Sequence, residues 1–275
     1  MSLPQTPYVF ASNTPSAHHC TFSSLSITHQ SNNLPANPHP ATPSHRVGYL
    51  GKDAAANLNW YTPQFVDAGK TTTDINAIQL DDGGAGAVGW GDVMQIADPF
   101  GSPAAVYMYY DKSMNPAGEA AGNFWGDDQL NPVDVSFDKA EGFGFDNMNA
   151  MEFKIVDSGE VIAENVQFAA EANLNWFGNP FPVAININAI QLDDGGAGAV
   201  GWGDVLQVAD PFGSPAAVYM YYDKSMNPAG EVAGNFWGDD QLNPVDVTFQ
   251  PGEAFAIDNM NSMEFDIIVT CPYSL

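Results

Sequence analysis

Basic residues and long apolar runs are scarce in this chain. Seven Lys and Arg stand against 33 Asp and Glu, which gives a net charge of −26. Because a charge of this sign and size repels phosphate groups, it disfavours binding to nucleic acids and to anionic membrane surfaces. No apolar run approaches the length needed to cross a bilayer, so we expect no membrane insertion.

Histidine and cysteine are also rare. All five His lie within residues 1–46, so the rest of the chain lacks the usual general base and the usual transition-metal ligand. The two cysteines, Cys20 and Cys271, could form one disulfide, bridge neighbouring molecules or stay free. These absences favour a protein that is not an enzyme. A glycoside hydrolase, which needs only two carboxylates, is the third alternative.

Residues 1–46 differ in composition from the remainder. They contain no Asp or Glu and many Ser, Thr, Pro and Asn, and they lack the apolar core of a secretory signal. Since such a composition cannot bury an apolar core, the sequence predicts a low-complexity N-terminal tail.

An internal duplication organises the chain after this tail. Residues 76–137 recur as residues 188–249, an offset of 112, with four differences in 62 positions. Weaker matches extend the repeat on both sides, and those before the block are offset by 116, as in Asn57–Trp60 and Asn173–Trp176. The sequence therefore predicts two modules of domain size, residues 47–160 and residues 161–275. The four differences are Met94/Leu206, Ile96/Val208, Ala120/Val232 and Ser136/Thr248.

Short segments rich in β-formers alternate with turn clusters such as Asp-Pro-Phe-Gly-Ser-Pro and Asn-Pro-Ala-Gly, and helical periodicity is nearly absent. This pattern predicts an all-β protein of two tandem β-sandwich domains, of jelly-roll or immunoglobulin-like type. In the first copy the expected strands are 57–61, 75–80, 92–96, 105–110, 123–125, 133–137, 142–145 and 151–156, and the second copy has the corresponding set.

One stretch carries a family resemblance. Residues 173–182, Asn-Leu-Asn-Trp-Phe-Gly-Asn-Pro-Phe-Pro, resemble the opening of an all-β repeat domain found in bacterial secreted and cell-surface proteins. Later parts of that pattern are matched by Pro-Gly-Glu-Ala-Phe at 251–255 and Gly-Glu-Val at 159–161. The resemblance implies a secreted or surface-exposed β-domain and no catalytic residue. The first copy departs from it, with Tyr-Thr-Pro-Gln-Phe at 61–65.

The acidic residues are mostly Asp in turns, where carboxylates can serve as hard ligands for calcium. No stretch matches the EF-hand loop. The best candidates for a structural Ca²⁺ site in each repeat are the paired acids that follow an aromatic residue: Asp127 and Asp128, with Asp239 and Asp240. A solubilising acidic surface is the simpler interpretation of the same residues.

Tryptophan supplies the candidate ligand-binding residues. Exposed Trp beside Asp and Asn can stack on sugars, whereas Trp more often fills a core. Trp90 and Trp202 lie between glycines, an awkward place for a core residue, and Trp125 and Trp237 precede the paired acids.

These features together lead to an expectation about function. We expect a non-enzymatic, extracellular or cell-surface structural protein, acting by self-assembly into a filament or surface layer or by multivalent adhesion to a glycan or protein. A calcium-stabilised, carbohydrate-binding adhesin is the alternative. The tail could lend a strand, such as residues 24–28, to a neighbouring sheet edge.

Overall fold

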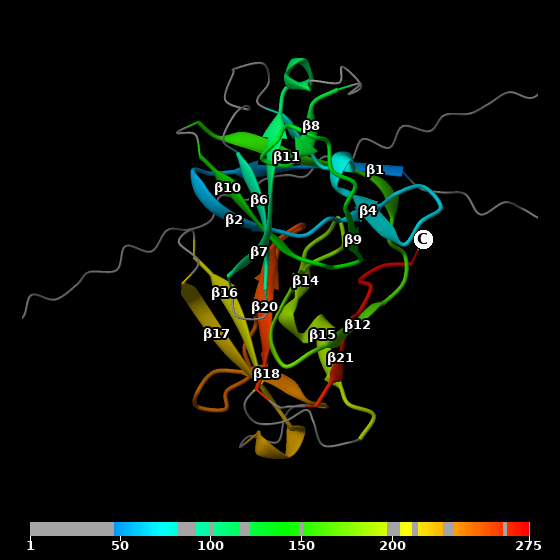
Figure 1. The fold of residues 1–275 in the computed structure, drawn as a ribbon. Helices are drawn as coiled ribbons and strands as arrows, with labels where there is room; N and C mark the ends of the chain where they lie inside the picture. Colours follow the sequence, from blue (N-terminus) through cyan, green and yellow to red (C-terminus); the bar gives the residue numbers. More distant parts are fainter. Residues whose placement is uncertain are drawn as a thin grey trace, which may run out of the picture. The chain divides into compact units, whose positions relative to one another are not determined.

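Antiparallel β-strands form nearly all of the regular secondary structure (Figure 1). The computed structural model describes residues 47–81, 92–98, 102–115, 122–148, 151–196, 204–210, 214–227, 234–260 and 263–274. Within these ranges the only helices are four single 3₁₀ turns of three residues each. None of these helices could span a bilayer. The all-β prediction is confirmed.

The first repeat contains three sheets. Five strands form the largest, in the order β2-β10-β6-β7-β8, and a second sheet has the order β1-β11-β3, with β5 also pairing with β11. β4 and β9 form a two-stranded ribbon. The strands are β1 Val47–Ala54, β2 Asn57–Tyr61, β3 Phe65–Val66, β4 Thr72–Asp74, β5 Gln79–Asp81, β6 Val93–Ala97, β7 Pro103–Tyr110, β8 Phe124–Gly126, β9 Ser136–Asp138, β10 Phe143–Asn147 and β11 Phe153–Val161.

The second repeat has the same plan. Its five-stranded sheet has the order β13-β20-β16-β17-β18, beside a three-stranded sheet β12-β21-β15 and a ribbon of β14 and β19. The strands are β12 Val166–Ala170, β13 Asn173–Gly178, β14 Ile185–Asn186, β15 Ile190–Asp193, β16 Val205–Ala209, β17 Pro215–Tyr222, β18 Phe236–Gly238, β19 Thr248–Phe249, β20 Ala254–Asn259 and β21 Phe265–Val269.

The two larger sheets of each repeat contribute to one apolar core. In the first repeat, Phe153 and Ile155 of β11 belong to the same buried cluster as Phe143 and Phe145 of β10. Side chains from two sheets that meet in one cluster are consistent with a β-sandwich. The β4–β9 ribbon adds Phe137 to this cluster.

One buried tryptophan anchors each core. Trp125 and Trp237 are fully buried, and their Nε1 atoms donate to the carbonyls of Ile78 and Ile190, each at 2.7 Å. The indole thus satisfies its one polar group while burying a large apolar surface. Tyr109 and Tyr221 pack edge-on against these two rings.

Several predicted strands need correction. The prediction for 57–61 matches β2, but residues 75–77 form a 3₁₀ turn because the Asp74 carboxylate accepts from the Asn76 N–H and caps it. Of the predicted strand 133–137 only Ser136 and Phe137 pair in a ladder, as part of β9, which continues to Asp138. The pattern also missed β1, β3 and β4, which are short, contain glycine or threonine, or pair with distant partners.

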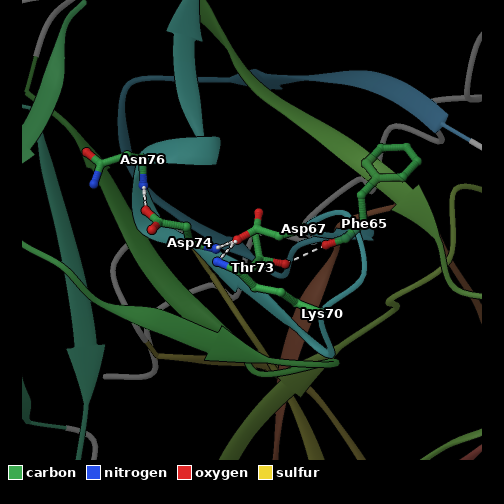
Figure 2. A network of polar contacts seen from close by, with 6 residues as sticks. All are labelled: Phe65, Asp67, Lys70, Thr73, Asp74 and Asn76. Carbon is green, nitrogen blue, oxygen red and sulfur yellow. Dashed lines mark hydrogen bonds and ion pairs between the residues drawn. The ribbon is translucent and has the colours of Figure 1, made fainter. Parts of the chain in front are cut away.

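The first repeat differs from the second most clearly between β2 and the 3₁₀ turn η1 (Ile75–Ala77), where it holds four more residues. Figure 2 shows the polar contacts that fold this longer segment. The Asp67 carboxylate accepts from the Asp74 N–H at 3.2 Å and forms an ion pair with Lys70 at 3.1 Å. The added residues therefore close a local turn ahead of η1.

The equivalence of the two cores predicts equal costs for equivalent substitutions. Trp125→Ala and Trp237→Ala should each lower the free energy of unfolding by about 3–5 kcal/mol, since each creates a large cavity. Val106→Ala and Val218→Ala, at exposed positions, serve as controls that should cost under about 0.5 kcal/mol. Urea unfolding of the four variants measures this. A cost for one Trp variant less than half that of the other would contradict equivalent packing.

Candidate functional site

The two repeats meet at the ends of their five-stranded sheets, in a contact that we term the junction. Its centre is a pair of equivalent residues, Trp60 at the end of β2 and Trp176 in β13. Their rings stack with centroids 4.0 Å apart and an angle of 8° between planes. Among the described residues, neither buried indole nitrogen has a hydrogen-bond acceptor, so the two side chains contact each other through their ring faces.

The contacts around this stack occur twice with the roles of the repeats exchanged. Tyr61 forms an antiparallel bridge with Glu253, and the equivalent Phe177 forms one with Glu141. Two backbone hydrogen bonds follow the same rule, from Thr62 N to the Gly252 carbonyl at 3.1 Å and from Gly178 N to the Ala140 carbonyl at 3.0 Å. A third, from Gly142 N to the Trp176 carbonyl at 3.0 Å, belongs to one side, because the Trp60 carbonyl accepts from Lys52. A contact set of this kind defines an isologous interface, with a local two-fold axis between the two tryptophans.

Close backbone approach explains one glycine of the junction. A Cβ atom at Gly178 would lie 2.4 Å from the Glu253 carbonyl oxygen and 2.7 Å from Cα of Ala254, and also 2.8 Å from Cγ2 of Thr62, the equivalent residue of the first repeat. Thr62 tolerates a side chain because its hydroxyl donates to the Glu141 carbonyl at 2.7 Å. The two faces of the junction are therefore similar but not identical.

A buried lysine gives the first repeat a charge at the junction. Nζ of Lys52, on β1, donates to the Trp60 carbonyl at 3.2 Å and to the Gly252 carbonyl at 2.9 Å. It lies 5.8 Å from the centre of the Tyr61 ring. Burial lowers the pKa of Lys52 to about 8, although nearby Glu253 favours the charged form.

A buried carboxyl group accompanies the lysine. Asp157 on β11 is fully buried, and one of its oxygens accepts from the Gln64 N–H at 2.6 Å. Burial raises the pKa of Asp157 to about 7, against the opposing effect of that hydrogen bond. Burial also raises the pKa of Tyr61 well above its ordinary value, and the neighbouring Asp157 raises it further.

The second repeat has apolar residues at all of these positions. The repeat offsets match Lys52 with Phe168, Tyr61 with Phe177, Gln64 with Pro180 and Asp157 with Val269. The strand registers agree, since Ala54 pairs with Phe153 as Ala170 pairs with Phe265. Phe168 packs on Phe177 with centroids 5.0 Å apart, where Lys52 lies over Tyr61. We term Lys52, Tyr61, Gln64 and Asp157 the polar group of the first repeat.

The predicted calcium ligands lie in turns at the ends of β8 and β18. Carboxylate oxygens of Asp127 accept from the N–H groups of Gln129 and Asn131 and from the Asn131 amide, and hydrogen bonds from Asn131 lower the pKa of Asp127. Asp239 repeats this arrangement with Gln241 and Asn243.

The adjacent acids, Asp128 and Asp240, are exposed. Over the ranges that the structure describes, no three His, Cys, Asp or Glu side chains come together as a metal site. Calcium at these turns stays a prediction whose further ligands would have to come from elsewhere.

The predicted tryptophan site divides into two cases. Trp125 and Trp237 are fully buried core residues, so they present no ring face to a ligand, and this part of the prediction is wrong. Trp90 and Trp202 lie outside the described residues.

The proposed disulfide involves a residue outside the described ranges as well. Cys20 belongs to the undescribed residues 1–46, as does the predicted donor strand 24–28. Among the described residues no second cysteine lies within bonding distance of Cys271, and its sulfur lies 3.1 Å from the Tyr273 carbonyl oxygen. The pairing of the two cysteines stays a prediction.

The comparisons with known proteins give no information about the junction. No protein-family model matches the chain, and neither a curated protein nor a solved structure matches it.

The junction was not predicted from sequence, although one signal pointed to it. The residues that meet there lie in the flanks 57–65 and 139–142, where the repeats have diverged, and not in the nearly identical block. Aligning the flanks position by position would have shown polar residues in one copy opposite apolar residues in the other. What this arrangement can do is bind one repeat to the other, with strength that depends on two buried ionisable groups.

Asp157 should make stability depend on pH. Its pKa is about 7 in the folded protein and near 3.8 when unfolded, so the folded state binds more protons between these values. The free energy of unfolding should therefore fall as pH rises from about 4 to 7, by up to about 4 kcal/mol at about 1.4 kcal/mol per pKa unit. Asp157→Val, which copies the second repeat, should remove this fall.

Urea unfolding between pH 4.5 and 8 tests this expectation. The control is Asp53→Asn, at an exposed position of β1, which should leave the pH profile of the wild type unchanged. An Asp157→Val profile parallel to that of the wild type would contradict a neutral buried carboxyl.

Proposed function

We propose that this chain is a non-enzymatic structural protein, outside the cell or on its surface, that links partners through two equivalent end surfaces. Each repeat is proposed to be a β-sandwich domain of jelly-roll or immunoglobulin-like type, related to the bacterial secreted and surface repeat domains that residues 173–182 resemble. Linking means either self-assembly into a filament or layer, or multivalent adhesion.

The observation that carries this proposal is the position of the junction. It forms where β2 ends and β10 begins, and likewise where β13 ends and β20 begins. Because strands are extended elements, the other ends of β2, β10, β13 and β20 lie away from the junction. The local two-fold axis relates these far ends of the two repeats, which therefore lie on opposite sides of the junction.

Exposed apolar side chains lie at these far ends. The connection from β10 to β11, which passes from one sheet to the other, exposes Met148 and Met151, 63% and 46% accessible. The connection from β20 to β21 exposes Met260 and Met263, 65% and 46% accessible. The backbone N–H of Met260 donates to Asp204, which precedes β16. Equivalent apolar groups at two ends suit contact with a repeated partner or with further copies of the chain.

The pattern of sequence identity supports the same role. The block that is nearly identical in the two repeats lies outside the junction, whereas the flanks that form the junction have diverged. The far-end methionines follow this block, but their segments also match between the copies, Asp146–Asn149 with Asp258–Asn261 and Met151–Phe153 with Met263–Phe265. Two copies of one binding surface require such identity, and a junction that only has to hold the repeats together does not. The strong negative charge keeps such a protein soluble and limits non-specific association.

The carbohydrate-binding alternative rests on few residues. With Trp125 and Trp237 buried, it depends on Trp90 and Trp202. The calcium that would stabilise it depends on Asp127 and Asp239, whose carboxylates already accept hydrogen bonds within their own turns. We therefore prefer the linking role.

One-ended variants test the linking role. In light scattering with electron microscopy, the wild-type chain should form assemblies that grow with concentration. The double variant Met148→Gln/Met151→Gln should stop at pairs of chains, because one end remains active. The matched variant Met260→Gln/Met263→Gln should behave identically, and the fourfold variant should be monomeric. Wild-type protein that stays monomeric and is not retained on surfaces of the producing cells would contradict the proposal.

A further inference from the structure

We propose that the junction face of the second repeat is a self-complementary surface whose alternative partner is the same face of another copy of this chain. This second face comprises Trp176, Phe177, Gly178 and Glu253, and the corresponding first face comprises Trp60, Tyr61, Thr62 and Glu141. The pairing uses the junction and not the far ends, so it goes beyond the proposed linking role and does not depend on it.

The isologous geometry supplies the first argument. In an isologous interface, residue i of one partner contacts residue j of the other and the reverse also holds, so each face carries both halves of every contact. Phe177 and Glu253, which now bridge to Glu141 and Tyr61, are both on the second face. Two second faces could therefore form both bridges with each other, and Trp176 would stack on Trp176 of the other copy.

The hydrogen bonds across the junction require no particular side chain. The two exchanged bonds join the N–H at position 62 or 178 to the carbonyl at position 252 or 140, and all of these are backbone groups. The side-chain bond from Lys52 to the Gly252 carbonyl is the exception, and a pair of second faces would lack it because Phe168 replaces Lys52. A pair of second faces would keep both exchanged bonds, from Gly178 to Gly252 in each direction. Gly178 also leaves more room than Thr62, the residue that it would replace in this pairing.

The polar group supplies the second argument, because it makes the faces unequal. A junction between two second faces would be flanked by Phe168 and Val269 of each copy, whereas one between two first faces would bury Lys52 and Asp157 twice. Burying an ionisable group away from water is unfavourable, as the shifted pKa values of Lys52 and Asp157 show. Self-pairing of the second face is therefore the stronger of the two.

Glu253 would not obstruct this pairing. It now has Lys52 nearby, and it would lose that neighbour next to a second repeat, where Phe168 occupies the position. The equivalent Glu141 bridges to Phe177, on which Phe168 packs, and burial raises the pKa of Glu141. The junction thus already accommodates a glutamate beside the apolar residues of the second repeat.

The short connection between the repeats favours the junction within one chain over the same pairing between two chains. Only residues 162–165 separate β11 from β12, and they are fastened by an ion pair between Lys139 and Glu164 of 2.5 Å and by a hydrogen bond of 2.8 Å from Tyr273 to the Ile162 carbonyl. A short tether gives the first face a high effective concentration near the second. Pairing between copies should appear when the first face is disabled or the tether is lengthened.

The test compares two matched variants of the full chain, in a background where the four far-end methionines, 148, 151, 260 and 263, are Gln. Trp60→Glu places a charge in the first face and leaves the second face intact, so we expect a dimer by sedimentation velocity. Trp176→Glu disables the second face instead, and it should self-associate at least about tenfold more weakly. The double variant Trp60→Glu/Trp176→Glu should be monomeric.

A lengthened tether provides a variant in which both faces are native. An insertion of about 12 Gly and Ser residues after Ala163, which is exposed, lets the repeats separate without altering either face. This variant should form dimers in proportion to concentration, and Trp176→Glu should abolish them.

Monomers throughout, for a Trp60→Glu variant that keeps wild-type circular dichroism, would overturn the proposal. Equal dimerisation of Trp60→Glu and Trp176→Glu would overturn the inequality of the faces. If Trp60→Glu does not fold, monomeric behaviour of the lengthened chain at all concentrations gives the same negative answer. Because the far-end methionines are replaced in every variant, failure here leaves the linking role standing.

Discussion

The stacked pair Trp60 and Trp176 is the constraint on which the arrangement of the two repeats depends. Together with the exchanged contacts around it, this stack of equivalent residues defines a local two-fold axis between the repeats. The bridges of Tyr61 and Phe177 and the backbone hydrogen bonds of Thr62 and Gly178 are related by this axis. The direction in which each repeat presents its far end follows from the same axis.

Divergence between the copies is concentrated where symmetry is not required. A true homodimer would place the same residue on both sides of the axis, but a fused pair can vary each side separately. Lys52 and Asp157 opposite Phe168 and Val269 are such variations. They give the first repeat two buried ionisable groups that the second repeat lacks, and buried polar groups commonly reduce stability while favouring one pairing over another.

Local patterns in the sequence predicted much of the fold but not the contacts between repeats. β2 and the two copies of the plan could be read from β-former runs and from the duplication, because both are local signals. Residues 75–80 were predicted as one strand because Ile75, Ile78 and Leu80 are apolar, and all three are buried. The chain nevertheless forms a 3₁₀ turn at 75–77, which the Asp74 side chain caps. Trp125 was misassigned because a pattern places a ring beside acids without telling which side of the strand faces the core.

The junction itself could not have been read from local signals. The two copies of Asn-Leu-Asn-Trp show which positions are equivalent, but only the folded chain stacks Trp60 of one copy on Trp176 of the other. This pairing also restricts how many repeats a chain can hold. Each repeat has one junction face, which covers the face of its neighbour, so a third tandem copy would expose a face that holds an unpaired tryptophan. Chains built on this plan should therefore lengthen by pairs of repeats and not by single ones.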